Sequence, residues 1–165
     1  MIAREVGCCI MIRAYGLPGP QGSKRFLGKR GGRGIMVESS KKVAPWREAV
    51  KWAAIKAGQK ITGPVSVVMV FTLPRPKSAS KRKPMVPSTR PDLSKLIRST
   101  EDALTGVLWR DDARIVCQLV RKVYAEDGRT GAQITVWTLP ATVAEGGIEF
   151  RPDAAEALLR GGLFA

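Results

Sequence analysis

Carboxylates gather in one short stretch of a strongly basic chain. Residues 49–91 contain neither Asp nor Glu, although the whole chain has 28 Lys and Arg against 14 Asp and Glu, a formal net charge of +14. Carboxylate oxygens suit Mg²⁺, which needs only one or two of them beside water and phosphate oxygens. The cluster therefore predicts a divalent-metal site that acts on a polyanion. Its members are Asp92, Glu101, Asp102, Asp111 and Asp112.

The residue types that are absent or scarce narrow the chemistry. The chain has no histidine, which removes the commonest general base and zinc ligand. Its three cysteines, Cys8, Cys9 and Cys117, have no CxxC spacing and are interpreted as reduced structural thiols. No apolar run approaches the roughly 20 residues of a membrane span, and the N-terminus is too polar for a signal peptide. We expect a cytoplasmic protein.

Each carboxylate also has a purely local explanation. Asp92 is suited to the N-cap of a helix, and the pair Asp111–Asp112 to a polar turn. Asp102 and Arg98, four residues apart, are suited to a solvated ion pair on a helix. Joint use is favoured because carboxylates packed together without a cation would repel one another. The turn of seven residues after Thr105 is long enough for Asp111 and Asp112 to fold back against the helix.

The elements that must position these residues follow from hydrophobic periodicity. Residues 92–105 have the apolar spacing of a helix, and a helical wheel places Glu101 and Ser94 together on the side away from Asp92. A second helix is predicted from Pro45 to Ala57, ended by Gly58. Strands are predicted at 8–15, 65–73, 115–124 and 132–139, the last two joined by the turn 127–131 as an antiparallel hairpin.

This order predicts an α+β fold: a single domain with a mixed or mostly antiparallel sheet and helices packed on one face. The domain is assigned to residues 1–140. Residues 141–165 carry four acids against two arginines, with a short helix near 154–159, and are interpreted as a peripheral or partner-facing tail.

Two basic segments, 21–42 and 74–91, are rich in Gly or Pro and are predicted to be loops, with a short strand at 35–37. Their cations are expected to contact DNA phosphates, which positions a duplex without determining sequence. The candidate phosphate contacts are Lys24, Arg25, Lys29, Arg30, Arg33, Lys81, Arg82 and Lys83.

The run from Arg90 to Gly106 (RPDLSKLIRSTEDALTG), followed by Trp109 to Val116 (WRDDARIV), resembles the RusA-type crossover junction endodeoxyribonucleases, the Holliday-junction resolvases. The upstream pieces 16–25 (GLPGPQGSKR) and 37–47 (VESSKKVAPWR) resemble the phage branch of that family. The resemblance covers roughly residues 10–140, and the run from 90 to 116 is its specific part.

The resemblance implies a Mg²⁺-dependent homodimer, with Mn²⁺ as an alternative ion, that nicks two strands of a four-way junction symmetrically. Asp92 matches the family's first aspartate, Asp112 its later catalytic aspartate and Arg98 its basic residue, with Asp111 as a further metal ligand. We expect Asp92 and Asp112 to converge on one ion. Phe26 either packs locally or wedges into the open centre of the junction. The family's second aspartate is Ser94 here, a weaker neutral ligand. Asp111, Asp102 or water is expected to fill that place.

The predicted function is therefore metal-dependent, structure-selective cleavage of branched DNA during recombination and repair. The expected setting is the cytoplasm of a bacterial host cell, with the protein encoded by a phage or prophage. No membrane and no small-molecule cofactor are expected to take part. Two alternatives remain: a DNA-binding module without catalysis, and a nuclease that acts on flaps or replication forks.

Overall fold

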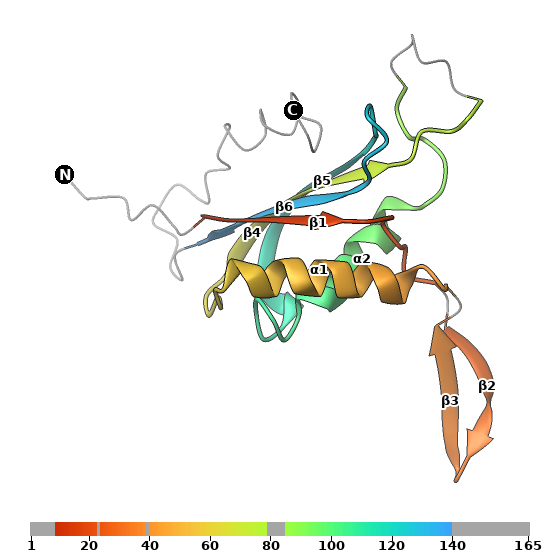
Figure 1. Ribbon diagram of the computed structural model, residues 1–165. Helices are drawn as coiled ribbons and strands as arrows, with labels where there is room; N and C mark the ends of the chain where they lie inside the picture. The colour runs from red at the N-terminus through yellow and green to blue at the C-terminus, as the bar shows by residue number, and fades with distance from the viewer. Residues whose placement is uncertain (1–8, 23, 39, 79–84, 140–165) are drawn as a thin grey trace.

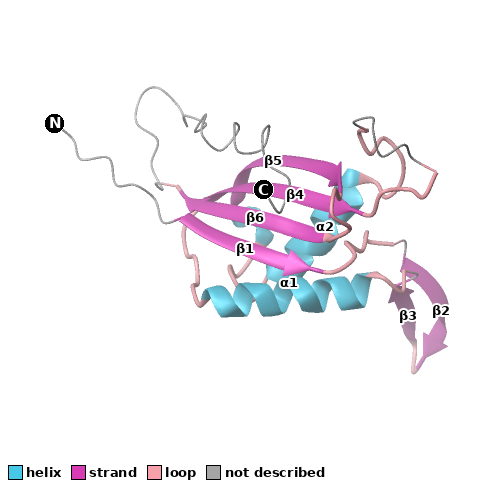
Figure 2. Ribbon diagram, turned by 45° about the horizontal axis from the view of Figure 1, so that its top comes forward, coloured by secondary structure: helices cyan, strands magenta, loops and turns pink. Residues whose placement is uncertain are grey.

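A four-stranded mixed sheet forms the body of the protein. The computed structural model describes residues 9–22, 24–38, 40–78 and 85–139. The sheet has the order β1-β6-β4-β5, and only the β4–β5 pair is parallel (Figure 2). Its strands are β1 (Cys9–Tyr15), β4 (Val65–Leu73), β5 (Ile115–Tyr124) and β6 (Gly131–Thr138). In the part of the chain that is described, no helix has the length and apolar character needed to span a membrane.

Both long helices cover the same face of this sheet (Figure 1). They are α1 (Val43–Ala57) and α2 (Leu93–Leu104). On β4 the alternate residues Val67, Met69 and Phe71 enter the core beneath the helices, whereas Val68 and Val70 belong to a smaller cluster on the other face. The predicted α+β fold, with a mixed sheet and helices on one face, is confirmed.

The predicted hairpin between the last two strands is wrong. β4 lies between β5 and β6, pairing in parallel with the former and antiparallel with the latter. The crossover through α2 returns the chain beside β4 in the same direction, as parallel pairing requires. The turn 125–130 then passes the end of β4, where Ala125 N donates to Leu73 O (2.8 Å). The most apolar strand thus takes the centre, where both faces are covered.

The helix ends follow local rules. Gly58 ends α1 in the left-handed conformation (φ +67°), as predicted, and α1 begins at Val43, two residues before the predicted Pro45. The predicted apolar stripe of α2 is confirmed, since Leu96, Thr100, Ala103 and Leu104 are buried. The predicted C-terminal helix near 154–159 lies outside the described residues.

The first basic segment is an antiparallel hairpin instead of the predicted loop. It consists of β2 (Lys24–Arg30) and β3 (Arg33–Glu38), and it projects away from the sheet and helices (Figures 1 and 2). The turn residues Gly31 and Gly32 have φ values of +59° and +77°. Two positive φ values in a two-residue loop match the twist of hairpin strands, and glycine adopts them without steric cost. The paired glycines therefore favour a hairpin, although the composition of the segment is typical of a loop.

The segment 16–22 ties the two helices together. Gln21 N donates to Lys95 O (2.9 Å), and Ser99 Oγ donates to Gly19 O (2.6 Å). A Cβ on Gly19 would overlap the carbonyl group of Lys42 at the start of α1. Glycine is therefore required where this segment passes between the helices.

Candidate active-site surface

Asp92 stands at the N-terminal end of α2 with an exposed carboxylate. It is the N-cap residue by backbone conformation, but its side chain makes no capping hydrogen bond. Instead, Asp92 Oδ2 lies 3.0 Å from Lys95 Nζ. The hydrogen bond and charge of Lys95, with smaller effects from Arg90 and Lys122, lower the pKa of Asp92. The carboxylate is thus ionised and accessible to a ligand.

Lys122 on β5 holds the segment that leads into Asp92. Its ammonium donates to Thr89 O (2.6 Å) and to Pro91 O (2.9 Å). Two backbone carbonyls are fixed by one cation, so the position of Asp92 depends on β5 as well as on α2. Sequence analysis missed Lys122. The available signal was the polar pair Gln118 and Lys122, which fall on one face of the strand, whereas Arg121 falls on the other.

Asp111 and Asp112 differ in their contacts. Asp111 Oδ1 accepts a hydrogen bond from Ala113 N (2.9 Å) and so caps the 3-10 turn η1 (Asp112–Arg114). Asp112 is exposed, and no hydrogen bond or ion pair holds its carboxylate within the described part of the chain. Asp111 therefore has a structural role at one oxygen, whereas Asp112 is free to bind a ligand.

Glu101 belongs to the same end of the surface as Asp112. Its carboxylate accepts a hydrogen bond from Gln118 Nε2 on β5. Partial burial raises the pKa of Glu101, and the negative charges of Asp112 and Asp102 add to that rise, while the Gln118 bond opposes it. The side of α2 that carries Glu101 and Ser94 therefore faces β5. Sequence analysis had placed those two residues on one side of the helix but had not predicted that this side faces β5.

Asp102 is bound to α1. Arg47 forms an ion pair with it and also donates to Gln21 Oε1 (2.5 Å). The predicted Asp102–Arg98 pair is therefore wrong, because Asp102 lies on the flank of α2 that faces α1. Arg98 is exposed and has no partner among the described residues. Since Asp102 links the helices, it is a poor replacement for the carboxylate missing at Ser94.

Asp92 and Asp112 lie at opposite ends of α2. A helix of 12 residues spans about 18 Å, and β5 runs beside it from Ile115, next to η1, to Lys122, next to Pro91. Among residues 9–22, 24–38, 40–78 and 85–139, no group of three or more His, Cys, Asp or Glu could hold a metal ion. Ser94 and Arg98 are exposed on α2 between the two aspartates.

The separation of Asp92 and Asp112 decides how these residues could bind Mg²⁺. Hard carboxylate oxygens are the correct donors, but one ion shared by Asp92 and Asp112 does not fit a single chain with this separation. An ion held by one carboxylate, completed by water and substrate phosphate oxygens, does fit, because Mg²⁺ needs few protein ligands. We define the residues along this strip as the α2–β5 surface: Asp92, Ser94, Arg98, Glu101, Asp112, Gln118 and Lys122.

The predicted phosphate contacts fall outside this surface. Lys24, Arg25, Lys29 and Arg30 belong to β2, and Arg33 begins β3 with an exposed side chain. The remaining three, Lys81, Arg82 and Lys83, lie outside the described residues. The charge of the first segment is therefore carried on a projecting hairpin (Figure 1).

An α+β domain with exposed carboxylates on one surface and a projecting basic hairpin is suited to an enzyme that acts on nucleic acid. Residues 17–136 match the family model described as Endodeoxyribonuclease RusA. The chain belongs to this family of endodeoxyribonucleases. It is also 31% identical over 140 residues to the uncharacterized protein YqaN of Bacillus subtilis (strain 168), an alignment that covers 76% of this chain and 95% of YqaN.

Proposed function

We propose that this chain is a Mg²⁺-dependent, structure-selective endonuclease that resolves Holliday junctions by cutting two strands symmetrically. The match to the family over residues 17–136 carries the proposal, because it includes both ends of the α2–β5 surface. The net charge of +14 supports a DNA substrate. Lys and Arg bind the phosphate backbone with release of condensed counterions, largely independently of sequence.

Asp92 and Asp112 are each proposed as a metal ligand, without sharing one ion within a single chain. Asp111 Oδ2 is a further candidate because only Oδ1 is used in the cap. When bound, Mg²⁺ would supply an activated water and neutralise charge on the scissile phosphate. Arg98 lies between the two aspartates along α2 and is exposed, and a guanidinium group presents several hydrogen-bond donors that match phosphate oxygens. We assign it to stabilising the negative charge that develops on the phosphate in the transition state.

A homodimer is proposed as the working form. A four-way junction has approximate two-fold symmetry, and a two-fold dimer presents the same surface to each of two equivalent strands. Equilibrium sedimentation of the free protein tests this directly. A monomer at micromolar concentration, both alone and on a junction, contradicts symmetric cutting by a dimer.

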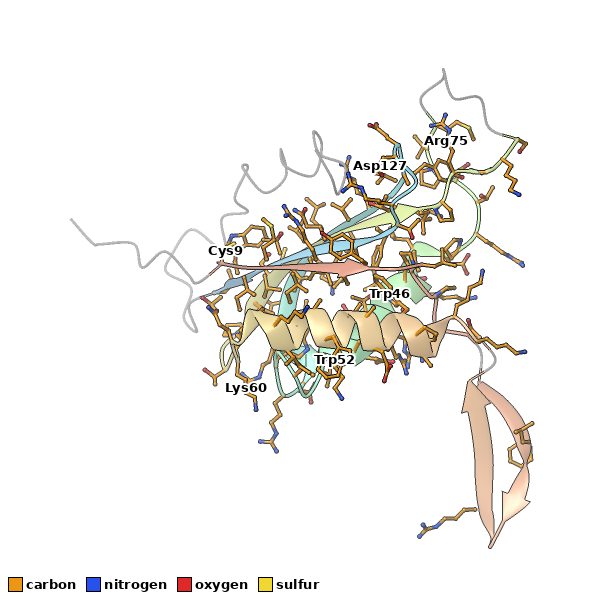
Figure 3. All side chains as sticks on the ribbon, in the orientation of Figure 1. Cys9, Trp46, Trp52, Lys60, Arg75 and Asp127 are labelled. Atoms are coloured by element: carbon orange, nitrogen blue, oxygen red, sulfur yellow. The ribbon has the colours of Figure 1, made fainter. Side chains whose placement is uncertain are left out.

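The experiment that tests catalysis uses a labelled four-way junction with Mg²⁺ or Mn²⁺. We expect the wild type to cut the junction, and Asp92→Asn and Asp112→Asn to lose at least about 100-fold in rate while still binding it. Asp127→Asn is the matched control. Asp127 is an exposed aspartate in the turn between β5 and β6, away from α1, and it pairs only with Arg129 in the described structure (Figure 3). Equal loss in all three variants contradicts the assignment.

The second candidate is a DNA-binding module without catalysis, and Ser94 is the observation that favours it. A hydroxyl removes one formal charge from the family's carboxylate set. Wild-type binding without cleavage in either metal supports this alternative. In that case Ser94→Asp is expected to restore cleavage. Flap and fork substrates in the same assay distinguish a true junction resolvase from a nuclease with broader structural selectivity.

A further inference from the structure

Among the described side chains of the β2–β3 hairpin, two are large, apolar and exposed to solvent. Phe26 is 55% exposed and Leu27 is 60% exposed. The hairpin projects from the body in both ribbon views (Figures 1 and 2), so these side chains contribute nothing to the core. Adjacent exposed apolar residues on a projecting element mark a binding surface.

A β-bulge sets their geometry. Phe26 pairs with Met36 and Gly28 with Ile35, so Leu27 is the extra residue, without a cross-strand partner. Gly28 has a φ of +129°, which residues with a side chain rarely adopt. Bulges redirect side chains and are frequent near functional sites. The glycine thus fixes an irregularity next to Phe26 and Leu27, the two exposed apolar residues among the described side chains of the hairpin.

The residues around this pair define the chemistry of its partner. Lys24 and Arg25 precede Phe26, Lys29 and Arg30 follow Gly28, and Arg33 lies just beyond the turn. A partner must therefore combine a dense negative backbone with an apolar or aromatic interior. DNA meets both requirements where base stacking is interrupted. Proteins commonly insert Phe or Leu between base steps while cations hold the adjacent phosphates.

We propose that Phe26 and Leu27 form a wedge that enters the branch point of the DNA and stacks on the base pairs exposed there. This inference rests on the proposed function, because it takes branched DNA as the substrate. Unstacking costs least where the stack is already broken. The wedge therefore favours a junction over a continuous duplex, whereas the surrounding cations bind both.

The test uses four-way junctions with 2-aminopurine either beside the branch point or in the middle of an arm. Protein is added in EDTA, so cleavage is not needed for a signal. We expect wild-type protein to raise fluorescence at the branch point only, and Phe26→Ala with Leu27→Ala to abolish the rise. The double variant should lose about 5-fold to 100-fold in junction affinity, with affinity for linear duplex unchanged within about 2-fold. Phe26→Trp should retain the rise.

Trp52→Ala is the matched control. Trp52 is 62% exposed on the outer side of α1, so this variant removes an exposed aromatic residue from the body of the protein (Figure 3). We expect it to behave as wild type. A double variant that keeps the fluorescence rise and the junction preference overturns the wedge. A double variant that loses duplex and junction affinity equally also overturns it, since the residues would then serve general DNA contact.

Failure of the proposed function is a separate result. If wild-type protein shows no preference for the junction over linear duplex, the substrate assignment fails before the wedge is tested. If wild-type protein prefers and cuts the junction while the wedge variants match it in every measurement, only the wedge fails.

Discussion

Trp46 Nε1 on α1 donates a buried hydrogen bond to Thr100 Oγ1 on α2 (3.0 Å). The same hydroxyl donates to Leu96 O (2.9 Å), so both the indole N–H of Trp46 and the hydroxyl of Thr100 have hydrogen-bond partners. This bond fixes the side-by-side packing of the helices. The position of the α2–β5 surface depends on it, because α2 carries most of that surface.

Thr100→Val keeps the shape of the side chain but leaves the buried indole N–H without an acceptor. We expect the free energy of unfolding to fall by about 1–3 kcal/mol. Urea denaturation measures this. Thr62→Val, at an exposed position, should change stability by less than about 0.5 kcal/mol. Equal effects of the two substitutions contradict a role for the bond.

Gly19→Ala tests the close approach between segment 16–22 and the start of α1. The added Cβ would overlap the carbonyl of Lys42 and lie 3.0 Å from Trp46 Cβ. Because backbone atoms cannot move aside easily, we expect a loss of about 1–3 kcal/mol in the free energy of unfolding. Gly63→Ala is the control, since its Cβ would meet only Leu139 O at 3.8 Å. Similar melting curves for both variants rule out the steric argument.

Lys122→Met removes the cation that holds Thr89 O and Pro91 O. We expect cleavage of the junction to slow by about 10-fold to 100-fold, because small displacements of reacting groups carry penalties of this size. Amide hydrogen exchange of residues 85–92 should become faster, while junction affinity in EDTA stays within about 2-fold. Lys60→Met removes an exposed lysine in the connection between α1 and β4 (Figure 3). It should leave both rate and exchange unchanged.

Local pattern was sufficient to predict most elements of the fold. β4 and β5 have the predicted ends, and the apolar stripe of α2 is buried as expected. Strand order was not predictable in this way, because the turn at Asp127–Gly128 has the composition of a hairpin whichever strands are neighbours. Whether β5 pairs with β6 or with β4 depends on how α2 returns the chain, which is a property of the whole sheet.

The sequence indicated which residues to consider for the site, but their arrangement in space could not be predicted from it. Sequence analysis selected Asp92, Asp112 and Arg98, and all three have exposed side chains on the α2–β5 surface. It expected the two aspartates to converge, because seven residues after α2 are enough for the chain to turn back. The parallel pairing of β5 instead starts the strand at the far end of α2. Lys122 was missed, and the contact of Glu101 with β5 was not predicted, because their partners come from distant segments.

Glu101 predicts a pH dependence of stability. Burial raises the pKa of its carboxyl above 4.5 in the folded protein, so the fold prefers the protonated form. The resulting stabilisation is fully present below the pKa that Glu101 has in the unfolded chain. It is lost as the pH rises through the pKa that Glu101 has in the folded protein. In Glu101→Gln this loss is absent. The difference in unfolding free energy should therefore move in favour of the variant as pH rises from about 4 to 7.

Urea denaturation of wild type and Glu101→Gln at four pH values across that range measures the effect. The exposed residue Glu126 supplies the control Glu126→Gln, which should follow the wild type. A difference between wild type and Glu101→Gln that is constant with pH, or that moves in favour of the wild type, contradicts the assigned cause.

The basic hairpin predicts the salt dependence of DNA binding. Each phosphate neutralised contributes a slope of about −0.9 to the logarithm of affinity against the logarithm of salt concentration. Replacing four hairpin cations by Gln (Lys24, Arg25, Lys29 and Arg30) should therefore make the slope shallower by about 2–4 on linear duplex. Replacing the four body lysines Lys41, Lys51, Lys56 and Lys60, all exposed, removes the same charge from α1 and its ends. If net charge alone attracts DNA, the position of the removed charges does not matter, and the two variants will have equal slopes. A larger change in the hairpin variant assigns the contacts to β2, where the wedge residues would then be held against the backbone.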